Sequence, residues 1–378
     1  MTGDDSDRAS TPGQPVREPP RCALRTGKLY NQGMRTLTLS GLLLLVVACE
    51  TPNEVQPQWL APVGTPLHAD LLEATEGAWL GGSRFALLSP GDNRIAVLDF
   101  ADGTVSRLDA EAREIQNPGH LFSLADTLFV SDWGRRRVTA WAGGTTLVRE
   151  VPLSPLAGGA LPRAVDAQGA LYFEVSPNPG PDGSGNRDSA AVVRVTPGAK
   201  TADTLARLTP LELAQVETSQ GRRFERRIFS GDDEWGVLPD GTVWVARYYH
   251  NRVDWRDTSG TWHAGPGLPD RVLEVTRVDR ERFAQQFPPE LQDRAQQLQY
   301  NPVKPAFVKG FTGAAGHVWL EKSRHVVDTM QTYHEVGREG QLLRELQVSG
   351  WGRVLATSDS AALVVRTDTV GFTVTLAQ

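Results

Sequence analysis

A repeated pattern of short strands constrains the fold of this 378-residue chain more than any other feature of its sequence. The clearest copy spans residues 240–260, where an Asp-Gly turn, a strand, a loop and a second strand follow one another. Val243, Val245, Val253 and Trp255 alternate with other residues, which is the period of a half-buried strand. Self-similarity at a fixed period indicates an array of similar units.

Five further copies have the same order of strand, loop and strand, and lie at residues 83–103, 126–144, 168–195, 316–340 and 361–376. Ile95 and Val138 occupy equivalent positions 43 residues apart, within the period of ~40–50 residues that is usual for propeller blades. A shorter apolar strand precedes each copy, and a further strand follows each of the first five. The pattern predicts an all-β chain that forms a six-bladed β-propeller with four-stranded blades over residues 58–378.

Ring closure and two interruptions complete the predicted architecture. We expect the segment from Gln58 to His68 to add an outer strand to the last blade, because closure removes exposed sheet edges. Residues 208–226 and 277–300 break the repeat, and the second segment has apolar residues at helical spacing around a break at Pro288-Pro289. A short helical insertion is therefore expected near 277–300. Both segments are either connections that pack on one face of the ring or a lid over its channel.

Charge and cysteine content exclude several classes of function. The chain has a net charge of -6, and without residues 1–49 the balance is 33 − 41 = -8, so nonspecific nucleic-acid binding is not expected. The 34 arginines against five lysines are typical of a GC-rich genome or of selection for anion binding. Cys22 and Cys49 both precede the repeats, which excludes a disulfide framework or a cysteine metal site within them.

The N-terminal region has the layout of an export signal. Met34-Arg35 is followed by an apolar run from Leu37 to Val47, which is shorter than the ~20 residues that span a bilayer. Ala48-Cys49 then resembles the lipobox of bacterial lipoproteins. The resemblance implies a signal peptide at 34–48, lipidation of Cys49 and a tether at 49–57. It also implies that translation starts at Met34, with residues 1–33 a mis-called upstream extension. The alternative is that Cys49 ends a transmembrane anchor.

The second repeat, with Asp132, a Trp-Gly-Arg-Arg loop and Arg137-Val138, resembles an NHL-type repeat. Residues 60–378 as a whole resemble the six-bladed β-propeller (NHL/TolB-like) bacterial lipoproteins, a mostly uncharacterised family. This resemblance implies a monomer that is exported to the cell envelope and held by its lipid in an inner- or outer-membrane leaflet, periplasmic or at the surface. Such a family shares a shape and specifies no chemistry.

No catalytic motif stands out. The chain lacks Gly-x-Ser-x-Gly, Gly-x-x-x-x-Gly-Lys and His-Glu-x-x-His. Residues 182–188 are similar to the start of a calcium loop, but Arg187 and Val193 stand where the motif has Gly and Glu. A flexible polar loop is the alternative.

Some propeller lyases that this fold resembles assemble a metal site from different blades. We therefore take His120, His250 and His317 as candidate zinc ligands; the alternative is that each is an ordinary surface or strand-end histidine. Asp232-Asp233-Glu234 is interpreted as a solvated strand start rather than an acid/base pair. No cofactor is expected, with calcium or zinc as the alternative.

The loops between the second and third strands of the blades carry aromatic and arginine residues, which are enriched at binding hot spots. Such loops are expected on one face of the ring. They predict a recognition surface for an anionic or sugar-like ligand or for a protein, and the alternative is that they are ordinary exposed residues. The candidate binding face comprises Trp133, Arg135, Arg136, Arg247, Tyr248, Tyr249, His250, Asn251 and Arg324, with Lys322 and His325 beside them.

The sequence favours a membrane-anchored propeller that binds a ligand or a protein over its channel face, rather than an enzyme. No residue is assigned a catalytic role. The alternative is a metal-dependent hydrolase or lyase with a site in the central channel.

Overall fold

The computed structural model describes residues 55–108, 115–176, 190–218, 221–269, 272–350, 352–367 and 372–378. The predicted signal peptide, the predicted lipidation site Cys49 and the candidate calcium loop at 182–188 lie outside these residues. Within them, no helix has both the length and the apolar character needed to cross a bilayer.

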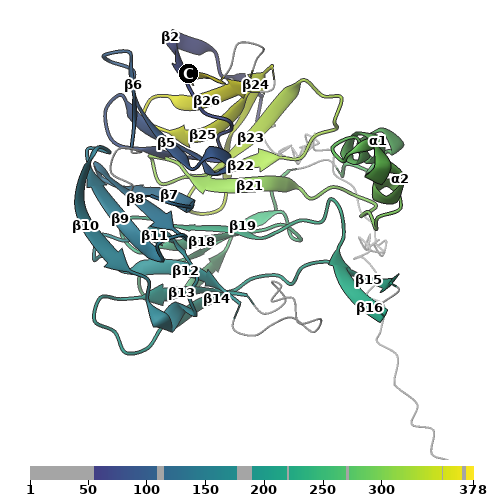
Figure 1. Cartoon of the computed structure of the whole chain (residues 1–378), viewed down its shortest axis with the longest axis horizontal. Helices are drawn as coiled ribbons and strands as arrows, with labels where there is room; N and C mark the ends of the chain where they lie inside the picture. The colour runs from purple at the N-terminus through teal and green to yellow at the C-terminus, as the bar shows by residue number, and fades with distance from the viewer. Residues whose placement is uncertain are drawn as a thin grey trace, which may run out of the picture. The chain divides into compact units, whose positions relative to one another are not determined.

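Six sheets, each with four antiparallel strands, form a ring in the described part of the chain, which confirms the predicted six-bladed β-propeller (Figure 1). The first three blades are β3 (Glu76–Trp79), β4 (Arg84–Ser89), β5 (Arg94–Asp99) and β6 (Thr104–Arg107); β7 (Pro118–Leu124), β8 (Thr127–Asp132), β9 (Arg137–Ala142) and β10 (Thr146–Pro152); and β11 (Pro162–Val165), β12 (Leu171–Val175), β13 (Ala191–Val195) and β14 (Asp203–Arg207).

The last three blades follow the same order, with the innermost strand first. They are β17 (Glu234–Val237), β18 (Val243–Arg247), β19 (Arg252–Arg256) and β20 (Trp262–Ala264); β21 (Phe307–Thr312), β22 (Val318–Lys322), β23 (Met330–Val336) and β24 (Leu342–Ser349); and β25 (Arg353–Thr357), β26 (Ala362–Thr367), β27 (Phe372–Ala377) and β2 (Pro62–Ala69). The innermost strands contact one another in the order β3, β7, β11, β17, β21, β25 and back to β3, so they line a central channel.

The two ends of the chain close the ring together. β2 pairs with β27, with Leu67 opposite Val374, which confirms the expected outer strand of the last blade. The first two residues of the expected segment differ, because β1 (Gln58–Trp59) runs parallel to β24 at the edge of the fifth blade. The N-terminal segment therefore joins two blades rather than one.

Each pair of neighbouring blades shares an apolar core. Between the last and the first blade, for example, Leu363 and Val374 pack with Phe85 and Leu87, and all four are buried. The innermost strands approach closely here: a Cβ on Gly77 would lie 3.0 Å from the carbonyl oxygen of Leu355. Apolar burial between blades is thus the main force that holds the ring.

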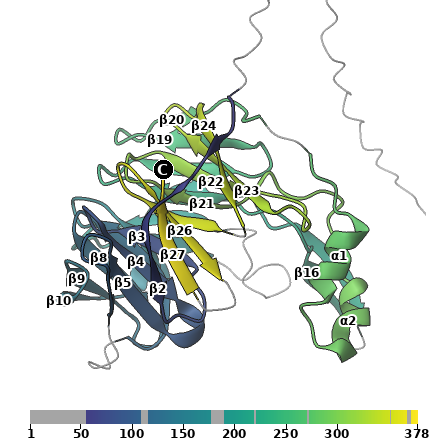
Figure 2. The same ribbon diagram turned by 90° about the horizontal axis from the view of Figure 1, so that it is seen from above.

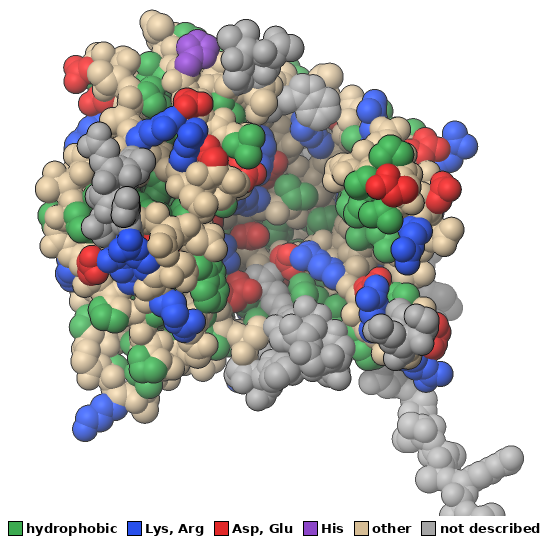
Figure 3. All heavy atoms as spheres, in the orientation of Figure 1, with side chains coloured by type: hydrophobic (Ala, Val, Ile, Leu, Met, Phe, Trp, Pro, Cys, Tyr) green, Lys and Arg blue, Asp and Glu red, His purple; other side chains and the backbone are tan. Residues whose placement is uncertain are grey.

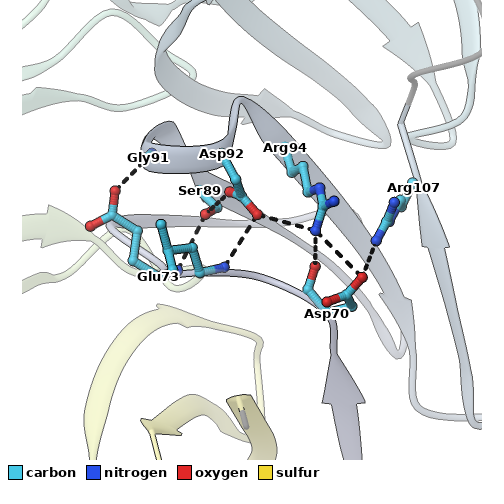
Figure 4. A network of polar contacts seen from close by, with 8 residues as sticks. Asp70, Glu73, Ser89, Gly91, Asp92, Arg94 and Arg107 are labelled. Carbon is cyan, nitrogen blue, oxygen red and sulfur yellow. Dashed lines mark hydrogen bonds and ion pairs between the residues drawn. The ribbon is translucent and has the colours of Figure 1, made fainter.

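Polar contacts fasten the connection between the closing blade and the first blade (Figure 4). The Asp92 carboxylate accepts a hydrogen bond from the amide of Leu72 at 3.2 Å, and the Glu73 carboxylate accepts one from the amide of Gly91 at 2.8 Å. Arg94 lies 3.4 Å from Asp70 in the same network. These contacts place residues 70–75 against the short 3-10 turn at Pro90–Asp92; a second such turn lies at Pro155–Ala157.

Two long connections leave the ring and pack on each other. The first connection contains the hairpin formed by β15 (Leu213–Thr218) and β16 (Gly221–Arg226). The second contains α1 (Arg277–Ala284) and α2 (Pro289–Gln296). The helical insertion expected near 277–300 is therefore confirmed as two short helices. Phe229 of the first connection packs on Phe283 and Tyr300 of the second at centroid distances of 5.9 and 6.0 Å. Figures 1 and 2 show the hairpin and the helices on the same side of the molecule, away from the blades. We call them the insertion unit.

The fifth blade buries a titratable imidazole that makes stability depend on pH. Burial and the nearby Lys322 lower the pKa of His334 to about 3, although Glu345 lies 3.3 Å from Nε2. Above pH ~6.5 the imidazole is neutral in both the folded and the unfolded chain; below it only the unfolded chain takes up the proton. The free energy of unfolding should therefore fall by about 2 kcal/mol between pH 8 and pH 5 through this residue alone.

Urea unfolding at a series of pH values tests this expectation. His334→Gln should reduce the loss of stability between pH 8 and pH 5, whereas His68→Gln, which replaces an exposed imidazole on β2, serves as the matched control. Parallel pH profiles for the wild type and His334→Gln would contradict the prediction.

Candidate functional site at the channel mouth

One face of the ring carries the connections between blades and also the predicted binding loops. Adjacent strands are antiparallel, so the loop between the second and third strands ends beside the connection that enters the innermost strand. The contacts agree: the Asp132 carboxylate accepts hydrogen bonds from the amides of Gln116 and Asn117 at 3.0 and 3.2 Å. Asp233, in the connection before β17, accepts one from the amide of Tyr248 at 3.2 Å. We call this side the insertion face.

Each innermost strand carries one ionisable side chain among its first three residues, where the strand leaves the insertion face. These six side chains encircle that end of the channel, and all belong to residues that are partly exposed. Figure 3 shows the surface hollowed between the blades and the insertion unit, with acidic and basic side chains on its walls. We name the set the mouth ring; its members are Glu76, His120, Arg163, Glu234, Lys309 and Arg353.

Glu76 and His120 form a carboxylate–imidazole pair across the first two blades. Nδ1 of His120 lies 3.0 Å from Oε1 of Glu76, and the amide of Leu121 donates to Oε2 at 2.7 Å. Burial alone would raise the pKa of the Glu76 carboxyl, but His120, Lys309 and the Leu121 amide together hold it below its usual value. The carboxylate thus fixes the imidazole through Nδ1 and leaves the Nε2 edge for other partners.

Arginines pair with carboxylates on the other side of the mouth. Arg163 lies 3.1 Å from Glu174 and 3.6 Å from Glu234, and its guanidinium stands 5.1 Å from the centre of the Trp235 ring. Arg353 lies 3.1 Å from Glu321. Arg163 pairs with a carboxylate of the adjacent strand and Arg353 with one of the preceding blade, and both guanidinium groups remain partly exposed.

Lys309 reaches across the ring. Its ammonium donates a hydrogen bond to the carbonyl oxygen of Thr75 in the first blade, although the innermost strand of the sixth blade lies between the two. Burial lowers the pKa of this ammonium, and Arg353 lowers it further, while Glu76 acts in the opposite direction. The Lys309 ammonium therefore loses its proton more readily than that of an ordinary lysine.

The three candidate zinc histidines lie in separate parts of the ring and have different neighbours. His120 belongs to the mouth ring, His250 packs edge-on against Tyr249 in the loop after β18, and His317 precedes β22 with its Nδ1 2.8 Å from Glu335. Among the described residues, no group of three or more His, Cys, Asp or Glu side chains is arranged to hold a metal ion.

Several residues of the candidate binding face hold the insertion unit in place. The fully buried Asp233 carboxylate accepts from Nη1 of Arg247 at 2.8 Å and from the amide and hydroxyl of Thr209 at 2.8 Å each. Tyr248 is buried beside these groups. Asn251 exchanges two hydrogen bonds of 2.8 Å with the backbone of Leu268. These side chains stabilise the loops of the insertion face rather than contact a ligand.

Other predicted residues are exposed. Trp133, Arg135, Arg136, Tyr249 and His250 all present surface to solvent, whereas Arg324 is half-buried, and its carbonyl accepts from Lys304 at 2.6 Å.

The exposed indole of Trp133 lies beside the mouth ring. A Cβ on Gly119 would come within 3.1 Å of Cδ1 of Trp133, so the indole lies against this strand next to His120. An aromatic surface thus adjoins the Glu76–His120 pair.

The Asp232-Asp233-Glu234 cluster does not act as one group. Asp232 pairs with Arg226 at 2.7 Å, Asp233 is buried in the loop contact, and Glu234 belongs to the mouth ring. The interpretation as a solvated strand start is therefore replaced by three separate roles.

No family model and no curated protein matches the chain. Solved structures that it resembles include a DUF4221 family member from Bacteroides vulgatus, at 7% identity, a TM-score of 0.47 and coverage of 86% of this chain and 97% of that one. A gluconolactonase from Xanthomonas campestris shares 14% identity at a TM-score of 0.43, covering 85% and 98%. The calcium-binding protein regucalcin from Agrobacterium tumefaciens shares 11% at 0.40, covering 84% and 95%. At these identities the likeness concerns the fold.

Proposed function

We propose that this propeller is a membrane-anchored binding module that takes a small anionic ligand at the mouth of its channel. The observation that carries the proposal is the mouth ring, in which Arg163, Lys309 and Arg353 come together at one opening. A concave site with low-dielectric walls strengthens the attraction between such cations and an anion. Trp133 supplies an apolar surface at the same rim, as ligand sites usually combine both kinds of contact.

Removal of the arginine charges should weaken binding. A panel of small carboxylates and sugar acids is titrated into the wild type by calorimetry, and the best binder is then titrated into Arg163→Gln and Arg353→Gln. Each substitution removes a charged hydrogen-bond donor and should raise the Kd at least about tenfold, since such contacts contribute ~1.4 kcal/mol or more.

Arg338→Gln is the matched control, because Arg338 lies in the turn between β23 and β24 and pairs with Asp240 away from the mouth ring. Unchanged affinity in both mouth variants, or an equal loss in the control, would rule out this site.

The membrane anchor rests on the sequence around Cys49 and has its own test. Cys49→Ser removes the thiol that takes the lipid, so labelled palmitate should no longer be incorporated and the protein should leave the membrane fraction. Cys22→Ser is the matched control and should change neither property. Membrane association that persists in Cys49→Ser would contradict lipid anchoring there.

The second candidate function is a propeller enzyme with its site in the same channel. The Glu76–His120 pair favours it, because a carboxylate that orients an imidazole is a common arrangement for proton transfer. Stoichiometric zinc or calcium in purified protein after dialysis would support the metal-dependent form of this alternative over a binding module.

A further inference from the structure

The mouth ring contains a lysine in a chain that otherwise uses arginine for its positive charges. Only five lysines occur, against 34 arginines. Among the described residues, Lys200 is exposed, Lys304 forms a buried pair with Asp279 at 2.6 Å and Lys322 is buried. Lys309 alone of these belongs to the channel mouth. Unlike a guanidinium, a lysine amine can lose its proton inside a protein and act as a nucleophile.

The backbone directs this side chain across the ring. The pairing of β21 with β22 shifts register between Phe307 and Lys309, which leaves Val308 as an extra residue in the strand. Such bulges often re-aim a side chain, here toward the first blade, where the ammonium meets the carbonyl oxygen of Thr75.

Charged groups surround the Lys309 amine on several blades. Glu76 of the first blade, Glu234 of the fourth and Glu321 of the fifth favour its protonated form, and Arg353 of the sixth opposes it. Burial outweighs the carboxylates and lowers the pKa of the amine, so the neutral form is more accessible than for an ordinary lysine.

An acid/base pair and a carboxylate-binding group adjoin the amine. The carbonyl oxygen of Thr75 accepts the hydrogen bond from the Lys309 ammonium, and Thr75 directly precedes Glu76. Oε1 of Glu76 lies 3.0 Å from Nδ1 of His120. Arg353 begins the innermost strand of the sixth blade, between the strand of Lys309 and that of Glu76. A nucleophile, a proton-transfer pair and a guanidinium therefore meet at one opening.

We propose that Lys309 forms a reversible imine with the carbonyl carbon of a small 2-oxo acid whose carboxylate is bound by Arg353. The inference rests on the proposed function and names the ligand class of that site. The neutral amine adds to the carbonyl group to give a carbinolamine. The carbinolamine hydroxyl takes a proton from the Glu76–His120 pair and leaves as water while the carbon–nitrogen double bond forms. The resulting protonated imine then returns a proton to the pair. Addition of water reverses both steps, so the protein and the 2-oxo acid are recovered unchanged.

Reductive trapping tests the inference on the full-length protein. Pyruvate or glyoxylate is added with sodium cyanoborohydride, and the modified peptide is identified by mass spectrometry. We expect one adduct, on Lys309, and none in Lys309→Arg, which keeps the positive charge. Lys200→Arg, which replaces an exposed lysine, should label as the wild type does. Arg353→Gln should need at least about tenfold more acid for half-maximal labelling. A thermal transition like that of the wild type establishes that Lys309→Arg is folded.

The outcomes separate the imine from the binding site itself. Labelling of Lys200 as strong as that of Lys309, or labelling that persists in Lys309→Arg, overturns the inference. Calorimetry with pyruvate and with lactate, which lacks the carbonyl group, gives the second comparison. Equal affinity for both acids without trapping overturns the imine and leaves the anion site intact. If no acid of the panel binds and none is trapped, both proposals fail.

Discussion

Removal of residues 360–378 should leave a chain that no longer folds as a unit. The truncation deletes β26 and β27, and β27 is the strand that pairs with the N-terminal β2. It also removes Leu363 from the core between the last and first blades and Val364 from the core between the fifth and last blades. The loss of these buried residues from two cores, together with two strands, should exceed the ~5–15 kcal/mol of stability that a typical domain possesses.

Circular dichroism during heating provides the measurement. The truncated chain should show no cooperative transition, whereas Gln378→Ala, which changes an exposed terminal side chain, should unfold as the wild type does. A sharp transition in the truncated chain would mean that five blades suffice and that ring closure is not required.

Replacement of Asp233 by alanine should destabilise the domain strongly for a single substitution. The carboxylate is fully buried and accepts hydrogen bonds from Thr209, Arg247 and the Tyr248 amide. Without it, a largely buried guanidinium and three further donors lose this acceptor, which typically costs ~3–5 kcal/mol. The β15–β16 connection should loosen at the same time, because Thr209 fastens its beginning to the fourth blade.

The adjacent Asp232→Ala provides the comparison. Asp232 pairs with the half-exposed Arg226, and loss of such a surface pair costs about 0–1 kcal/mol. Urea unfolding compares the two variants, and hydrogen exchange of residues 213–226 reports on the connection. Equal loss of stability in both variants would show that the buried Asp233 contact does not hold the β15–β16 connection to the fourth blade.

The fold could be predicted from the sequence because its signals are local. Alternation at Val243 and Val245 and a turn at each strand end recur in every blade, and both depend only on neighbouring residues. The parallel pairing of Gln58 with Leu346 was not predicted, since a two-residue strand has no period.

The site could be predicted only in part, because its members meet through closure of the ring. Glu76 begins β3 and Lys309 is the third residue of β21. Each resembles an ordinary polar residue near a strand start, and only the circular arrangement brings them to one opening. Tyr248 and Asn251 were predicted as exposed loop residues, but a connection more than 15 residues away in sequence returns and covers them. Leu268 does so for Asn251, over a separation of 17 residues.

The closing blade also determines when the molecule can finish folding. β2 must wait for β27, since Pro62 pairs with Ala377 near the other end of the chain. A ribosome releases β2 long before its partner exists, so until β27 has been made the edge of β2 lacks its native partner strand. Contacts of such sequence separation form slowly, typically in milliseconds to seconds. A chain of this design therefore closes its ring only after β27 has been synthesised.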